Sequence, residues 1–265
     1  MAIRTSYEHG QFCWIDLAAR DMEAAREFYH QLFGWESPDG ETQGTSYLHF
    51  ALDGKRVAGM RGMSAEMLNQ DQPSCWNSYI NVDDISAACA RVSELGGKVV
   101  EPEVEVPGAG TRALIQDPTG GQVGLWRKGS HFGAELTQDF HCCCWNELMT
   151  RDIETARDFY GRLFNWEFAD YTSTDAKYYV VSHAGEESSG LLEMDARWGD
   201  MPARWMVYFA VQGVDLTVDF VRQLGGFVLV HPFDIPEGRF AMVTDDQGGA
   251  FDLVEMSDEP EEDAG

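Results

Sequence analysis

The chain has 265 residues, enough for two domains of ordinary size, and 44% of them are hydrophobic, a share typical of globular proteins. Its formal net charge of −26 would repel a phosphate backbone, so nucleic-acid binding is not expected. No apolar run approaches the ~18 residues of a membrane span, and the first residues form no signal peptide, so a cytoplasmic protein without a membrane partner is expected.

The chain is an internal duplication. A tryptophan, a carboxylate two residues later, an aspartate and a helical pattern of apolar residues recur in both halves at the same spacing. In the first half these residues are Trp14, Asp16, Asp21, Ala25, Phe28, Tyr29, Leu32, Phe33 and Trp35. In the second half they are Trp145, Glu147, Asp152, Ala156, Phe159, Tyr160, Leu163, Phe164 and Trp166. Later blocks also recur, so paired positions can be compared within one sequence.

Each half divides into two units with the same order of elements. Residues 12–18 alternate as a strand with Ile15 and Leu17 on one face, and Asp21 then caps an amphipathic helix. Short strands are expected near 35–38, 45–52 and 56–62. The second unit has a strand at 76–82, a helix that ends at Gly96-Gly97, and strands near 98–101, 111–116 and 121–126.

The second half repeats this order after a linker at 127–140. The predicted domains are therefore 1–130 and 131–256, followed by an acidic tail at 257–265. The cysteines form no CxxC pair, and we expect buried free thiols rather than a redox or metal role. They are Cys13, Cys75, Cys89, Cys142, Cys143 and Cys144.

The pattern strand-Asp-x-x-x-Ala-x-x-Phe-Tyr-x-x-Leu-Phe-Gly-Trp resembles the vicinal oxygen chelate superfamily, which comprises glyoxalase I, extradiol dioxygenases, and bleomycin- and fosfomycin-resistance proteins. The second half shows the pattern with one change, Asn165 for Gly34. The resemblance covers roughly residues 10–256 and points to a two-domain branch, labelled glyoxalase-like or hydroxylase, that includes a mycobacterial secreted antigen. It implies an α+β fold in which four βαβββ units form two U-shaped, eight-stranded sheet domains with ligand-holding concave faces.

In metal-using members of that superfamily, the ligands come from the first and last strands of each unit. The corresponding positions here are Trp14, Asn77, Trp145, Met206, Gly59, Gly124, Gly190 and Asp252. An indole offers no lone pair to a divalent ion, and only Asp252 supplies a good oxygen, with Glu193 as an alternative to Gly190. No histidine lies at a matching position. We therefore predict that the protein uses neither a metal nor another cofactor.

Strand alternation predicts the concave faces independently of the resemblance. Asp16 and Glu147 lie on the same strand face as a tryptophan, where a carboxylate is costly unless it is paired, hydrated or used. They are the candidate catalytic residues, as a general base or as an anchor for ligand hydroxyl or amine groups. The candidate ligand-binding residues are Trp14, Asn77, Tyr79, Gln122, Trp126, Trp145, Met206, Tyr208 and Asp252. The tryptophans fit a plug of the interior as well as a ligand wall.

Three functions fit these features, and each has a small molecule as its partner. The first is a metal-independent enzyme, of lyase, isomerase or hydroxylase-like type, that acts on an oxygenated or aromatic metabolite. The alternative is a non-catalytic sequestering protein of bleomycin-resistance type, which the negative charge favours, although a solvated, salt-adapted surface is the simpler explanation of the charge. The third, a metal-dependent glyoxalase or dioxygenase, is opposed by the missing ligands. The sequence leaves homo-oligomer formation open, as it does the substrate and the identity of the active cavity.

Overall fold

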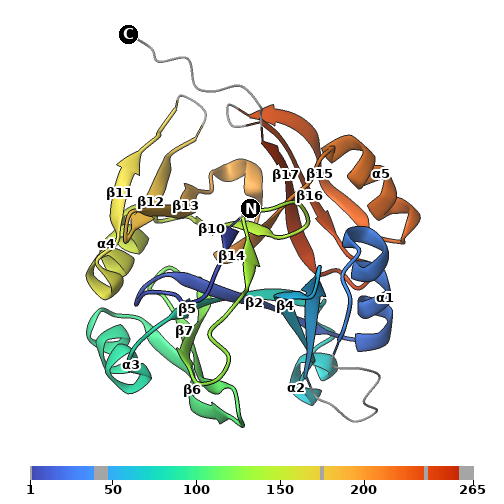
Figure 1. Ribbon diagram of the computed structural model, residues 1–265. Coiled ribbons are helices and arrows are strands. Elements are labelled where there is room, and N and C mark those ends of the chain that lie inside the picture. The colour runs from blue at the N-terminus through green and yellow to red at the C-terminus, as the bar shows by residue number, and fades with distance from the viewer. Residues whose placement is uncertain (1, 39–46, 174–175, 236–237, 257–265) are drawn as a thin grey trace.

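In the computed structural model, the described residues are 2–38, 47–173, 176–235 and 238–256, so the predicted acidic tail lies outside them. Each half builds one large sheet (Figure 1). The first sheet has the order β3-β4-β2-β5-β8-β7-β6. Its strands are β2 (Phe12–Ala19), β3 (Tyr47–Leu52), β4 (Lys55–Gly62), β5 (Cys75–Asn81), β6 (Lys98–Val106), β7 (Gly110–Gln116) and β8 (Gln122–Lys128).

The second sheet repeats this arrangement with the order β11-β12-β13-β10-β14-β17-β16-β15. Its strands are β10 (Cys143–Thr150), β11 (Glu167–Asp170), β12 (Tyr178–His183), β13 (Glu186–Glu193), β14 (Arg204–Ala210), β15 (Phe227–Ile235), β16 (Gly238–Thr244) and β17 (Ala250–Met256). In each sheet the first strands of the two units pair antiparallel at the centre, β2 with β5 and β10 with β14. The predicted fold of repeated units forming two curved sheets is confirmed.

The two sheets differ at one edge. The strand predicted at 35–38 is reduced, within the described residues, to a single bridge between Glu36 and Ala51, whereas the second half has β11 at this place. Pro38 has no backbone N–H to donate to a ladder, which accounts for the short pairing. The first sheet therefore has seven strands in the described part of the chain, against eight in the second.

The helical elements are α1 (Met22–Phe33), α2 (Ala65–Asn69), α3 (Ile85–Glu94), α4 (Ile153–Phe164), α5 (Val214–Gln223) and the 3₁₀ turn η1 (Ala196–Trp198). The helix predicted in each of the four units is present, whereas α2 and the turn η1 are additional elements that were not predicted from the sequence. The Asp21 side chain accepts hydrogen bonds from two backbone N–H groups in the first turn of α1. Gly34 ends α1 with φ 72°, and Asn165 ends α4 with φ 57°. Asparagine tolerates this left-handed conformation, which explains the one change between the repeated patterns.

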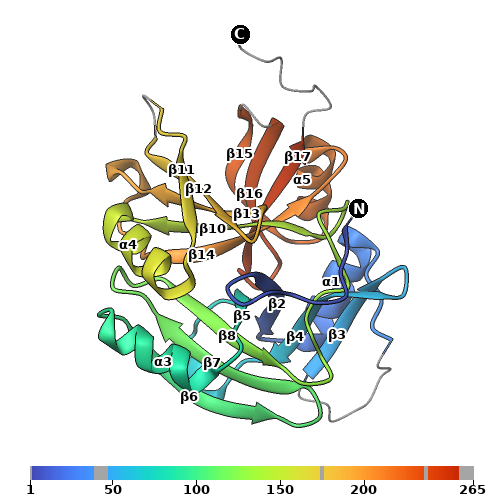
Figure 2. The ribbon, with the colours of Figure 1, turned by 60° about the vertical axis from the view of Figure 1, so that its left-hand side comes forward.

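The two halves pack through their helix-bearing faces. Helices α1 and α5 lie together on one side of the molecule and α3 and α4 on the other (Figures 1 and 2). Each of the two main hydrophobic cores contains residues of both halves: Phe28 and Tyr29 pack with Phe209 and Phe251, for example. The halves therefore share their cores instead of each having its own.

The repeated motif residues join the halves by buried hydrogen bonds. The Tyr29 hydroxyl donates to Asp245 Oδ2 at 3.0 Å and accepts from Trp76 Nε1 at 3.0 Å. The mirrored set is Tyr160, Asp117 and Trp205, at 2.9 Å for both bonds. The helix tyrosines of one half thus bond to the aspartate turns of the other, and the motif residues stabilise the interface rather than a ligand.

The predicted linker is partly ordered as sheet. β1 (Ala2–Ile3) pairs antiparallel with β9 (Leu136–Thr137), and β8 continues to Lys128. In the described part of the chain, no helix has the length and hydrophobicity that crossing a bilayer requires.

Candidate functional site

The carboxylates of both first strands lie on the concave faces. Asp16 on β2 is 2% exposed and Glu147 on β10 is 5% exposed. Their neighbours Leu17 and Leu148 point the opposite way into the shared cores, as strand alternation predicts. A carboxylate this buried is costly unless other groups hydrogen-bond to it.

In the first half, a network of side chains surrounds Asp16. Its Oδ2 accepts from the Tyr79 hydroxyl at 2.9 Å and, more weakly, from the Tyr47 hydroxyl at 3.5 Å. Its Oδ1 accepts from Asn77 Nδ2 at 2.9 Å. The Tyr47 hydroxyl in turn accepts from Trp14 Nε1 at 2.7 Å. The predicted residues Trp14, Asn77 and Tyr79 are therefore brought together around the candidate carboxylate.

The second half repeats this network around Glu147. Its two oxygens accept from the Tyr208 hydroxyl at 2.7 Å and from the Tyr178 hydroxyl at 2.9 Å. Trp145 Nε1 donates to the Tyr178 hydroxyl at 3.1 Å. Sequence reasoning missed Tyr47 and its counterpart Tyr178. Their equal spacing in the two repeats was the available signal.

Glycines make room for these two tyrosines. A Cβ atom at Gly59 would lie 2.1 Å from the Tyr47 hydroxyl oxygen, and one at Gly190 would lie 2.1 Å from that of Tyr178. Gly190 pairs with Glu147 in the sheet as Gly59 pairs with Asp16, which fixes the alignment that the sequence left open.

The donor set does not fit a metal of the kind that the resemblance implies. The expected ligand positions on the first strands hold tryptophans, whose N–H groups donate to tyrosines. At the expected last-strand positions, Gly59 and Gly190 have no side chain, and phenol hydroxyls occupy the space beside them. Glu193 lies opposite Thr150, away from Gly190 in the ladder. Across the described ranges, no three His, Cys, Asp or Glu side chains converge as a metal site. We therefore derive no chemistry from a metal.

Asp252 distinguishes the second half from the first. It lies beside Tyr208 on β17, at the place that Gly124 has beside Tyr79 on β8. Asp252 is fully buried, and neither carboxyl oxygen has a hydrogen-bond partner among the described residues. Burial and the nearby Glu147 raise the pKa of Asp252 well above its ordinary value. Unpartnered buried carboxyl groups are rare and costly, which makes this one a functional candidate.

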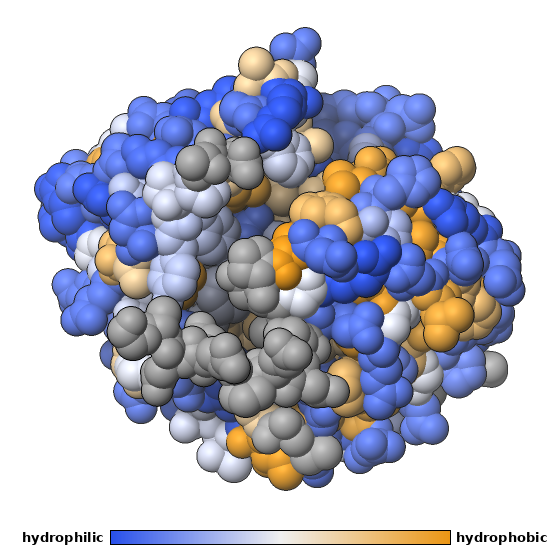
Figure 3. Space-filling view, turned by 90° about the horizontal axis from the view of Figure 1, so that it is seen from above, coloured by the Kyte–Doolittle hydropathy of each residue, from blue (hydrophilic) through white to orange (hydrophobic). Residues whose placement is uncertain are grey.

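Flexible apolar side chains line the concave face of the second half. Its buried members are Met149, Met194, Met206, Tyr208, Phe240, Met242 and Val254. Partly buried side chains surround them: Cys144, Trp145, Leu192, Trp198, Met201, Val230, Ile235 and Ala250. In Figure 1 the arms β11–β13 and β15–β17 rise on either side of β10 and β14, and the view from above shows hydrophobic side chains among hydrophilic ones on this side (Figure 3). Methionine adapts its shape to irregular apolar ligands.

The corresponding face of the first half is filled by residues from the linker. The His131 ring stacks edge-on against Trp14 at 4.5 Å between centroids and lies 5.6 Å from Trp126. His131 is buried, and neither ring nitrogen has a hydrogen-bond partner among the described residues, so burial lowers its pKa to about 3. The predicted residue Gln122 is exposed at the start of β8 and does not join this group.

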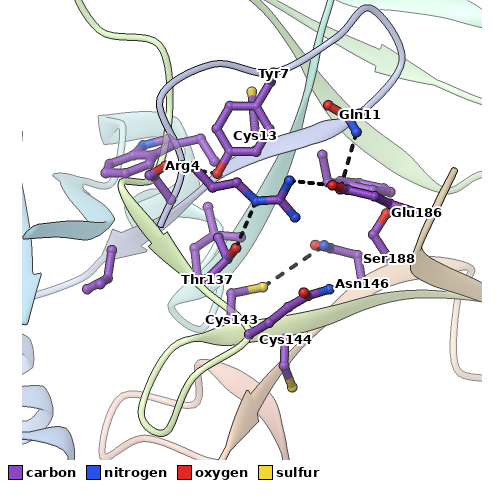
Figure 4. A pocket seen from close by; sticks show the side chains of 16 residues that line it. Arg4, Tyr7, Gln11, Cys13, Thr137, Cys143, Cys144, Asn146, Glu186 and Ser188 are labelled. Carbon is purple, nitrogen blue, oxygen red and sulfur yellow. Dashed lines mark hydrogen bonds and ion pairs between the residues drawn. The ribbon is translucent and has the colours of Figure 1, made fainter. Parts of the chain in front are cut away.

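A cavity of about 50 Å³, with room for a few waters, lies between the halves (Figure 4). Arg4 donates to Glu186 at 2.7 Å and to Thr137 at 3.3 Å, and Gln11 also donates to Glu186. Burial raises the pKa of the Cys143 thiol in its wall to about 12, so this thiol is unreactive. The cavity is small and its polar groups bond to one another, so we interpret it as part of the packing between the halves and not as a ligand site.

The family follows from comparison with known proteins. The model of the glyoxalase/bleomycin resistance protein/dioxygenase superfamily matches residues 11–125 and 140–253. The chain belongs to this superfamily. Its two matches coincide with the two sheets.

Two relatives are similar along nearly their whole length. CFP32 of Mycobacterium tuberculosis, whose name assigns it provisionally to the glyoxylases, is 35% identical over 96% of this chain and 98% of its own. The anthracycline biosynthesis protein DnrV of Streptomyces peucetius is 34% identical over 95% of each chain. The expected resemblance to a mycobacterial branch of the superfamily is thereby confirmed.

Solved structures of superfamily members share the fold. The 2,3-dioxygenase LapB of Pseudomonas sp. KL28 has a TM-score of 0.64 at 13% identity and covers 97% of this chain and 96% of its own. The Mn(II)-bound glyoxalase of Novosphingobium aromaticivorans has a TM-score of 0.63 at 14% identity, covering 93% of this chain and 82% of its own. At this identity the likeness concerns the fold alone.

Proposed function

We propose that the second half is the active site of a metal-independent enzyme that transfers protons on a small oxygenated or aromatic molecule. Glu147 acts as the general base and Asp252 as the general acid. The observation that carries the proposal is the fully buried Asp252 carboxyl, which has no hydrogen-bond partner in the described structure and faces a methionine-lined surface. Such a group is retained at a cost in stability, which function explains.

The surroundings of the two carboxyl groups favour opposite roles. Glu147 accepts hydrogen bonds from two phenol hydroxyls, an arrangement made by a carboxylate. Burial and the charge of Glu147 raise the pKa of Asp252, which favours the protonated form that a general acid requires. A pair of carboxyl groups whose environments differ in this way provides a base and an acid in one site. Proton transfer alone supports a lyase or an isomerase better than a hydroxylase.

The first half lacks a counterpart of Asp252, and its concave face is filled by protein side chains. Gly124 stands where Asp252 stands in the second half, and a Cβ there would lie 2.2 Å from the Tyr79 ring. His131 and the tryptophans fill its concave face. We therefore assign ligand binding to the second half and a structural role to Asp16.

The ligand class is inferred from the side chains of the concave face of the second half and from the relatives. Methionine and aromatic side chains suit a flat apolar body, while the carboxyl groups select an oxygen-bearing one. A relative named for anthracycline biosynthesis is consistent with an aromatic substrate. Neither nucleic acid nor a membrane has a part in this proposal.

Sequestering without chemistry is the second candidate function. The net charge of −26 and two neighbouring carboxyl groups favour a cationic aromatic ligand. In that case Glu147→Gln would weaken binding itself, by about 1–3 kcal/mol for the lost charge-assisted hydrogen bond.

Deuterium incorporation from D2O tests the proposal on a panel of compounds with exchangeable C–H bonds. Aryl ketones, β-diketones and hydroxylated aromatic acids are incubated with the protein, and mass spectrometry detects exchange at carbon. We expect Glu147→Gln and Asp252→Asn to lower the exchange rate of a responsive compound about a hundredfold or more, with binding little changed. Asp16→Asn is the matched control and should retain the exchange. Loss of exchange in Asp16→Asn alone would place the chemistry in the first half and refute the proposal.

A further inference from the structure

Arg204 is an uncompensated cation in the second half. It is partly buried at the start of β14, and its Nε atom is buried without a hydrogen-bond partner. Among the described residues, no ion pair joins its guanidinium to a carboxylate, and Asp252 acts on it only through its electrostatic field. In a chain with a net charge of −26, an arginine without a paired carboxylate is unexpected.

Arg204 shares the concave face with the proposed acid. Arg204, Met206 and Tyr208 alternate along β14, so their side chains point to the same side of the sheet. Arg204 and Asp252 influence one another electrostatically, since each shifts the pKa of the other. They nevertheless do not touch, because both Asp252 oxygens and the Arg204 Nε are without partners.

In the first half an arginine lies within ion-pairing distance of the first-strand carboxylate, although its Nε atom, like that of Arg204, has no hydrogen-bond partner among the described residues. There the Arg61 Nε lies 4.0 Å from Asp16 Oδ1, and the strand position that corresponds to Arg204 is occupied by Cys75. In the protonated form proposed for Asp252, the carboxyl group brings no negative charge to the Arg204 guanidinium. A ligand group that binds this guanidinium must therefore supply the negative charge.

We infer that Arg204 binds a carboxylate of the substrate, which is a small organic acid with an apolar, preferably aromatic, body. The planar guanidinium matches a carboxylate with two parallel hydrogen bonds, and its Nε–H is one of the donors that such a pair uses. The body of the acid then contacts the methionine side chains, and Asp252 in its protonated form donates to a second oxygen or to the reacting carbon. The inference rests on the proposed location of the active site and adds the charge of its substrate.

Benzoate and benzamide test this charge selection because they have the same shape and differ in charge. Isothermal titration calorimetry measures both dissociation constants at neutral pH for the full chain and for Arg204→Met, which keeps the length of the side chain. We expect the wild type to bind benzoate at least about tenfold more tightly than benzamide, and Arg204→Met to remove this preference. Arg204→Lys should keep part of it, because the charge remains while the planar fork is lost.

Arg61→Met is the matched control, since Arg61 faces the other concave surface and should leave benzoate binding unchanged. Thermal unfolding of each variant shows that it is folded. Equal preferences in wild type and Arg204→Met, no benzoate binding at millimolar concentration, or loss of binding in Arg61→Met would each overturn the inference. The proton-transfer proposal is judged separately: exchange that depends on Glu147 and Asp252 together with unchanged benzoate preference in Arg204→Met refutes only the role of Arg204.

Discussion

Replacing His131 by phenylalanine makes the stability of the protein less dependent on pH. The ring of His131 packs against Trp14 and Trp126 in the first half, and both of its nitrogens are buried without partners among the described residues. Protonation there would bury a charge. His49 on β3 and Arg56 on β4 oppose that charge further, and Glu135 in the linker offsets only part of the penalty. Phenylalanine keeps the ring packing and removes the titration.

The magnitude follows from the two pKa values. His131 titrates at about 3 in the folded protein and at 6.5 when exposed in the unfolded chain. Between these values the unfolded chain binds one more proton, so the free energy of unfolding falls by about 1.4 kcal/mol for each unit by which the pH decreases. The contribution is fully present above pH ~6.5. From neutral pH to pH ~4.5 it should decrease by roughly 2.7 kcal/mol in the wild type and not at all in His131→Phe.

Urea unfolding followed by tryptophan fluorescence measures this difference at both pH values. All other titrating groups are common to the two proteins, so they cancel when the variant is compared with the wild type. His231→Gln, a change at an exposed histidine, is the control and should follow the wild type. If the wild type and His131→Phe lose the same stability on acidification, His131 is accessible to protons and the first concave face is open.

Three further outcomes are expected. Gly190→Ala should destabilise the protein by about 2–4 kcal/mol in urea unfolding, because the new Cβ atom would lie 2.1 Å from the Tyr178 hydroxyl oxygen and force it away. An unchanged midpoint of unfolding would contradict the packing described. Tyr160→Phe should cost about 1–3 kcal/mol, since it leaves Asp117 Oδ2 and Trp205 Nε1 without their buried partner, and an effect near zero would mean that this bond does not hold the halves together. Protein purified without added metal should contain no stoichiometric divalent ion by plasma mass spectrometry; one tightly held equivalent of zinc, nickel or iron would refute the metal-independent proposal.

Much of the fold could be predicted from the sequence because it depends on local geometry. Strand alternation places Trp14 and Asp16 on one face whatever the strand packs against, and the aspartate before α1 caps the helix through its own nearest backbone groups. The duplication supplied a second copy of each pattern as a check. The short pairing at Glu36 was missed because the helical and strand periods carry no information on how far a ladder extends.

The partners of those side chains were decided only by the tertiary structure. The sequence identifies Glu147 and Asp252 as members of one face, but their surroundings arise from strands and loops that meet only after folding, which leave Glu147 bonded to two tyrosines and Asp252 to none. The filling of the first concave face by His131 likewise depends on a linker whose path no periodicity predicts. Burial and unsatisfied hydrogen bonds are properties of the whole packed chain, and for that reason the different surroundings of the carboxyl groups in the two repeated halves appeared only in three dimensions.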